Sequence, residues 1–138
     1  IIRIVPEGGK FSKGYVYARK EVNPEDWFFP CHFHGDPVMP GSLGVEAIIQ
    51  ALQAFALQQG IGNSLKSPRF LPVLSKVAWK YRGQIIPQNK YMQLDLHVKN
   101  IEQKEGQVVL TAAANLWRED LRIYEIFVIV VGISETEK

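Results

Sequence analysis

The stretch from Gly41 to Gln59, GSLGVEAIIQALQAFALQQ, decides the fold of this chain. Its apolar residues recur at helical spacing and cover nearly the whole circumference: Leu43, Val45, Ala47, Ile48, Ile49, Ala51, Leu52, Ala54, Phe55 and Leu57. A helix that is apolar all round is a buried one. The following GIGNS segment at residues 60–64 ends the helix, because glycine favours the helix C-terminus. The sequence therefore predicts one long buried helix.

Segments of alternating polarity on both sides of this helix predict antiparallel strands. Before it, residues 11–22 alternate, with Val16, Ala18 and Lys20 on one face. After it come four more such segments, at residues 76–82, 94–99, 107–117 and 121–133, the last three joined by short turns. The last segment is apolar on both faces, which predicts an inner position in the sheet. Together these elements predict an α+β domain whose curved antiparallel sheet wraps around one helix.

Length and composition indicate a single globular domain. The chain has 138 residues, of which 46% are hydrophobic and 22% charged, and this length can bury a core. A net charge of +2 is too weak to indicate a nucleic-acid partner. A single cysteine, Cys31, fits a reducing cytoplasmic setting, and no apolar run is long enough to cross a membrane. Because the first residue is Ile1, we expect residues 1–138 to be one domain excised from a longer chain.

The segment richest in chemical groups runs from Cys31 to Gln50 and reads CHFHGDPVMPGSLGVEAIIQ. It resembles the signature of the β-hydroxyacyl-acyl-carrier-protein dehydratases, His-Phe-x-Gly-x-Pro-Val-Met-Pro-Gly followed by Leu-x-x-Asp/Glu-Ala and Gln. Residues 8–29 and 81–101 also resemble the 3-hydroxydecanoyl subfamily, so the resemblance covers essentially the whole chain. The phrase DPVMPGSLGVEAI is still more similar to dehydratase domains of polyunsaturated fatty acid and polyketide-type synthases. The resemblance implies a hotdog fold.

The resemblance also implies that His32 is the catalytic base and Glu46 the acid. Dehydration of a 3-hydroxyacyl thioester removes a proton from C2 and expels the C3 hydroxyl as water, which gives a trans-2-enoyl thioester. Histidine titrates near neutrality and suits the first step. A carboxyl set among apolar helix residues is desolvated, which favours the protonated form that the second step needs. We expect no cofactor and no metal.

Further residues are expected to shape this site. Gly41 and Ser42, at the start of the helix, offer free backbone N–H groups to the enolate oxygen, and Val38 and Gln50 are expected to help position the substrate. Gln50 lies one turn beyond Glu46 and either hydrogen-bonds it or has a structural role. The flanking aromatic residues predict an apolar acyl tunnel lined by Trp27, Phe28, Phe33 and Phe55.

One departure from the resembling subfamily concerns Glu46. The 3-hydroxydecanoyl subfamily has Asp at this position, whereas the general elongation dehydratases have Glu. Either acid can donate a proton, so the departure leaves dehydration intact. It puts in doubt the isomerase activity by which the Asp subfamily moves the new double bond.

Two other patterns have competing interpretations. His32, His34 and Asp36 spell HxHxD, which opens a zinc-ligand cluster in some metallohydrolases, but such sites need further histidines and only His97 remains. His34 is expected at the pocket wall or on the surface. The basic row of Lys76, Lys80 and Arg82 predicts either a solvated face or a docking surface for an acidic acyl carrier protein.

Two rival functions share the predicted fold. One is a hotdog thioesterase, and the other is a catalytically silent structural half of a double-hotdog module. In the resembling families two hotdogs pair edge to edge, and each site takes its histidine from one and its acid from the other. A sheet ending in strands such as residues 107–117 would expose edge groups that favour pairing. We therefore expect a homodimer, or a pseudo-dimer with a second hotdog, and no nucleic-acid or membrane partner.

Overall fold

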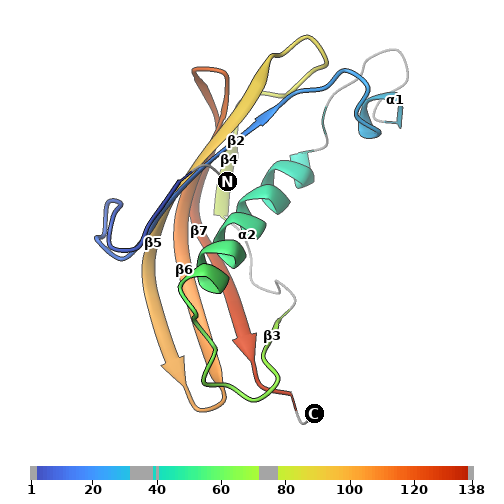
Figure 1. Cartoon of the computed structure of the whole chain (residues 1–138). Helices are drawn as coiled ribbons and strands as arrows, with labels where there is room; N and C mark the ends of the chain where they lie inside the picture. Colours follow the sequence, from blue (N-terminus) through green and yellow to red (C-terminus); the bar gives the residue numbers. More distant parts are fainter. Residues whose placement is uncertain (1–2, 32–38, 40, 72–77, 137–138) are drawn as a thin grey trace.

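The computed structural model describes residues 3–31, 39, 41–71 and 78–136. Helix α2 (Gly41–Gln58) lies on the concave side of a strongly curved antiparallel sheet (Figure 1). The strands are β1 (Arg3–Val5), β2 (Tyr15–Glu21), β3 (Arg69–Phe70), β4 (Ala78–Tyr81), β5 (Tyr91–Lys104), β6 (Gln107–Arg118) and β7 (Leu121–Ser134). A short helix, α1 (Phe28–Cys31), follows β2. The predicted α+β architecture, a sheet wrapped around one helix, is confirmed.

The sheet order is β1-β2-β5-β6-β7-β3, and β4 also pairs with β7. Strand β6, up to Leu116, and strand β5, from Tyr91 to Val98, bury every second residue, as their alternation predicts. Strand β7 has neighbours on both sides, which confirms the inner position predicted from its two apolar faces. The prediction that β6 lies at the edge of the sheet is wrong, because β5 and β7 flank it. Among the described strands, those with a neighbour on one side only are β1, β3 and β4.

Helix α2 begins and ends close to where the sequence predicts. At its C-terminus Gly60 has a left-handed φ of 68°. The N–H of Ile61 donates to the carbonyl of Ala56 (2.9 Å), and the N–H of Gly60 donates to that of Leu57 (3.2 Å). This pair of bonds is the Schellman arrangement, which satisfies helix carbonyls that would otherwise lack partners.

One side of α2 packs into the core, and the other stays open. Ile48, Leu52 and Phe55 are fully buried against the sheet. The exposed side carries Ser42, Glu46, Gln50, Leu57 and Gln58. The buried face of α2 therefore covers less of the helix circumference than the sequence predicts. Within the described residues, no helix combines the length and the hydropathy needed to cross a membrane.

The approach of α2 to the sheet depends on Gly44. A Cβ atom at this position would lie 2.5 Å from Cε2 of Tyr124, a fully buried ring of β7. Gly44→Val should therefore lower the free energy of unfolding by about 1–3 kcal/mol through overpacking. Leu57→Val is the control, because Leu57 is 68% exposed and the change introduces the same β-branched side chain into the same helix. Urea denaturation of both variants measures the difference, and equal stabilities would contradict the close packing.

Candidate active site

Several residues of the predicted site lie outside the part of the chain that the structure describes: His32, Phe33, His34, Asp36, Val38 and Lys76. Their roles stay predictions. The described members are Gly41, Ser42, Glu46 and Gln50 on α2, and the aromatic residues Trp27, Phe28 and Phe55. Gly41 is the first residue of α2, as the predicted oxyanion role requires.

Glu46 and Gln50 form a side-chain pair on the open side of α2. The Nε2 group of Gln50 donates a hydrogen bond to Oε1 of Glu46 at 3.2 Å. The two residues are one turn apart, and Ser42 lies one further turn toward the helix start, also exposed. Of the two alternatives that the sequence left open for Gln50, the structure contains the hydrogen bond to Glu46. The predicted apolar setting of Glu46 is wrong for a single copy of the chain, because its side chain is exposed.

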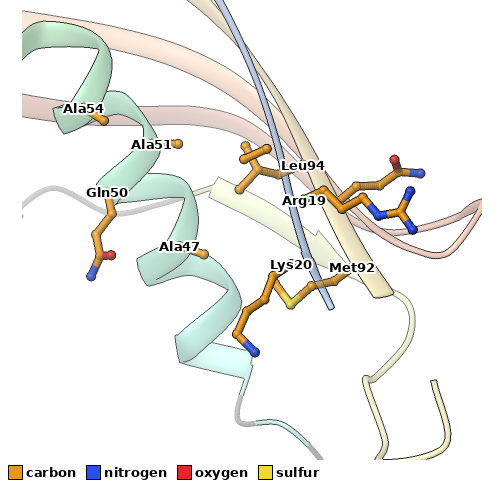
Figure 2. Close-up of a pocket in the computed structure, with 10 residues that line it drawn as sticks. Arg19, Lys20, Ala47, Gln50, Ala51, Ala54, Met92 and Leu94 are labelled. Carbon is orange, nitrogen blue, oxygen red and sulfur yellow. The ribbon is translucent and has the colours of Figure 1, made fainter. Parts of the chain in front are cut away.

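A groove of about 390 Å³ separates α2 from strands β2 and β5 (Figure 2). Its size lies within the usual range for small-molecule sites. The helix contributes Ala47, Gln50, Ala51 and Ala54, and the strands contribute Ala18, Arg19, Lys20, Met92, Gln93 and Leu94. Gln50 therefore belongs both to the groove and to the hydrogen-bonded pair with Glu46.

The two ends of this groove differ in polarity. Lys20 pairs with Met92 across β2 and β5, and both lie beside Ala47 at the end nearer the start of α2 (Figure 2). The ammonium of Lys20 is 3.1 Å from Oδ2 of Asp26. Further along, Ala18 pairs with Leu94, and these face the following turn of α2. The groove thus carries the charged side chain of Lys20 at one end and is apolar between Leu94 and Ala54 at the other.

Of the aromatic residues predicted to line an acyl tunnel, Trp27, Phe28 and Phe55 do not line this groove, and Phe33 lies outside the described residues. Trp27 is 69% exposed, whereas Phe28 and Phe55 are buried in the core. The rings of Trp27 and Phe28 meet edge to face, with centroids 5.7 Å apart. The sequence pattern did not single out the alanines that line the groove. In the apolar pattern of the helix, an alanine beside a groove looks the same as an alanine packed in the core. Their spacing at i, i+4 and i+7 on one helix face was the available signal.

A second polar cluster lies on the sheet face that points away from α2. Asp95 on β5 accepts hydrogen bonds from Nδ2 of Asn115 (2.8 Å) and Nε1 of Trp117 (2.7 Å), both on β6. His97 Nδ1 accepts from the backbone N–H of Lys10 at 3.1 Å, so its Nε2 carries the proton that it donates to Asp95 at 3.1 Å. Both ring nitrogens of His97 are therefore engaged, which indicates a structural role. Among the described residues, no group of three or more His, Cys, Asp or Glu side chains could hold a metal ion.

Solved structures with similar architecture include thioesterases. The fluoroacetyl-CoA-specific thioesterase FlK, in a variant bound to fluoroacetate and CoA, superimposes with a TM-score of 0.58 and 9% identity, covering 87% of this chain and 90% of that chain. A probable thioesterase from Bartonella henselae gives a TM-score of 0.55 with 9% identity, covering 87% of this chain and 88% of that chain. At such low identities the likeness shows the fold alone.

Sequence comparison gives the family. The FabA-like domain matches residues 1–127. A polyunsaturated fatty acid synthase polypeptide of a Thraustochytrium species is 42% identical over 138 residues, which cover 99% of this chain and 9% of that protein. The chain therefore spans only a small part of that relative's length. With the curved sheet around α2, these matches show that the chain belongs to the FabA-like family and has a hotdog fold.

Proposed function

We propose that this domain dehydrates a 3-hydroxyacyl thioester carried on an acyl carrier protein. The observation that carries the proposal is the hydrogen-bonded Glu46–Gln50 pair on α2, whose member Gln50 also lines the groove, in a chain of the FabA-like family. A proton donor next to a site for an alkyl chain is what the reaction requires. Family membership supports a dehydratase-type role, and the relative from a polyunsaturated fatty acid synthase supports an acyl-chain substrate.

The reaction divides between two residues. His32 takes the proton from C2, and the electron pair of that C–H bond forms the new double bond to C3. Glu46 gives its proton to the C3 hydroxyl as the C–O bond breaks, so the oxygen leaves as water. Backbone N–H groups at Gly41 and Ser42, at the positive end of α2, stabilise the charge that develops on the thioester oxygen.

A second hotdog completes the site in this proposal. Glu46 lies on the open side of α2, where the described chain leaves it in contact with water. A carboxylic acid donates best when water is excluded from it. We therefore propose a homodimer, or a pseudo-dimer within a longer synthase, in which the partner covers this side of α2 and supplies His32.

Thioester hydrolysis is the main alternative, because structural neighbours with this fold are thioesterases. Incubation with a 3-hydroxyacyl thioester followed by mass spectrometry separates the possibilities. Loss of one water from the thioester supports the dehydratase. Release of the free acid would replace it with a thioesterase, and an unchanged substrate would indicate a silent structural half.

The carboxylate at position 46 leads to a prediction about the product. Because this chain has Glu46 where the isomerising subfamily has Asp, we expect the trans-2-enoyl thioester to accumulate with little cis-3 isomer. Gas chromatography of the released acyl chains measures the ratio. Abundant cis-3 product from the wild-type domain would contradict this expectation.

A further inference from the structure

We propose that a hollow on the outer face of the sheet binds an organic cation, a guanidinium or alkylammonium group. The hollow has a volume of about 210 Å³ and lies on the side of the sheet that points away from α2. This size is below the usual range for drug-sized ligands and suits a small charged head group. This site shares no residue with the proposed dehydratase site and is independent of it. Three aromatic residues, two carboxylates and one amide line the hollow: Tyr15, Tyr17, Trp117, Asp95, Asp120 and Gln93.

Strand pairing brings these side chains together on one face. Leu94 is buried toward α2, so its neighbours Gln93 and Asp95 point to the opposite side of β5. Tyr17 of β2 lies directly opposite Asp95, and Trp117 of β6 lies directly opposite Gln93. The hollow is therefore built on three neighbouring strands, which hold its walls in a fixed arrangement.

Asp95 supplies an oriented negative charge. Its carboxylate accepts hydrogen bonds from Asn115 (2.8 Å), Trp117 (2.7 Å) and Nε2 of His97 (3.1 Å). All three donors are neutral, because Nδ1 of His97 accepts from the backbone N–H of Lys10 and carries no proton. They fix the position of the carboxylate without cancelling its charge. Among the described residues, no Lys or Arg forms an ion pair with Asp95.

The negative charge acts on the other groups of the hollow. Burial, and next the charge of Asp95, raise the pKa of the Tyr15 hydroxyl above its ordinary value, and the cation Arg3 opposes this only in part. Asp120 adds a second carboxylate, whereas no Lys or Arg of the described chain lines the hollow. The charge of the hollow therefore complements a cation and repels an anion.

The same face of the sheet already holds one cation of the chain against an aromatic ring. The guanidinium carbon of Arg19 lies 3.8 Å from the centroid of the Tyr91 ring, and the hydroxyl of Tyr91 donates to Asp120 at 3.3 Å. A cation over a ring is an attractive arrangement that recurs in the recognition of ammonium ligands. The hollow combines rings and carboxylates in the same way and includes Asp120 itself. This combination points to an organic cation as the ligand.

The experiment follows the indole N–H resonance of Trp117 by NMR while N-acetyl-arginine N-methylamide is added. This N–H donates to Asp95, so a cation at the carboxylate must change its resonance. We expect a saturable shift with a dissociation constant of about a millimolar, as is usual for a ligand of few atoms. The matching citrulline derivative has the same shape without the charge and should give no saturable shift. The indole of Trp27, which is 69% exposed, should not respond to either compound.

Charge-removing variants test the lining residues. Asp95→Asn should weaken binding by at least about tenfold, because it removes an oriented charged acceptor. Asp120→Asn should weaken it about threefold, since exposed ion pairs contribute less. Glu102→Gln is the matched control, because it removes an exposed carboxylate from the same strand as Asp95 but not from the hollow, and it should bind as wild type does.

The dispersion of the amide spectrum establishes that each variant is folded. If Asp95→Asn does not fold, Asp120→Asn decides the matter, because Asp120 is an exposed turn residue. Equal binding of the arginine and citrulline derivatives, no saturable shift in the wild type, or wild-type affinity in the folded carboxylate variants would overturn the inference.

The cation has two possible sources, a free small molecule or an arginine side chain of a protein segment. A short peptide with one arginine between glycines is titrated in the same way to separate them. Tighter binding of the peptide than of N-acetyl-arginine N-methylamide supports the site and assigns it to a protein segment. Equal binding supports the site and assigns it to a free cation.

Discussion

Glu46→Gln is expected to lower the rate of dehydration by about 10²–10⁴-fold, the usual contribution of a general acid or base. The amide keeps the size of the side chain and the neighbour Gln50 but has no acidic proton to give to the leaving hydroxyl. His32→Ala is expected to abolish turnover for the complementary reason, since no base remains to take the C2 proton. Steady-state assays on a 3-hydroxyacyl thioester measure both effects.

The stability of a single folded chain should change little in Glu46→Gln, because Glu46 is exposed there and its hydrogen bond joins two exposed side chains. Glu102→Gln is the matched control, since Glu102 is an exposed carboxylate on β5, remote from the groove, with Lys104 3.8 Å away. It should retain wild-type activity. A wild-type rate in Glu46→Gln would remove Glu46 from the mechanism.

Mixing His32→Ala chains with Glu46→Gln chains is expected to restore activity that neither variant has alone. In the proposed dimer each site combines His32 of one copy with Glu46 of the other. A mixed dimer therefore contains one site with both residues intact. With random exchange in a symmetric dimer, half of the dimers are mixed and each has one good site of two, so activity should return to about a quarter of the wild-type level.

Exchange of chains between dimers must be shown independently, by native mass spectrometry of chains that carry different isotope labels. Mixing His32→Ala with Glu102→Gln provides the reference for dilution of active chains. Proven exchange without recovery would mean that each chain carries a complete site of its own. The exposed side of α2 would then not be the place where a second copy supplies His32.

The sequence predicted the main elements because their signals are local. The helix end at residue 59 is one residue from the observed Gln58, since the glycine that terminates it acts through its own backbone. Strand β2 begins at Tyr15 and not at Phe11, because the N–H of Gly14 donates to the carbonyl of Gly8 (3.0 Å) in a turn. The position of β6 was predicted wrongly, since strand order depends on long-range pairing that a single strand does not encode.

The candidate site was predictable to a similar extent. The contact between Gln50 and Glu46 follows from a spacing of four residues on a helix. The exposure of Glu46 does not follow from the sequence. Its apolar neighbours in sequence lie on other sides of the helix, and the sheet covers only one side of α2. The groove was missed for the opposite reason. Its helix wall consists of alanines, and a small side chain leaves a groove only where the facing strand is not packed directly against it.

The Asp95 cluster has a consequence for how the strands find their partners. Asp95 lies directly opposite Asn115 across β5 and β6, and Trp117 lies two residues further along β6. A slip of one residue would move Asp95 away from both donors and would turn Leu94 and Leu96 toward water. The carboxylate would then be left with unmet hydrogen bonds on a half-covered surface. The outer surface of the sheet thus carries a specificity check on the alignment of the strands, independent of the packing around α2.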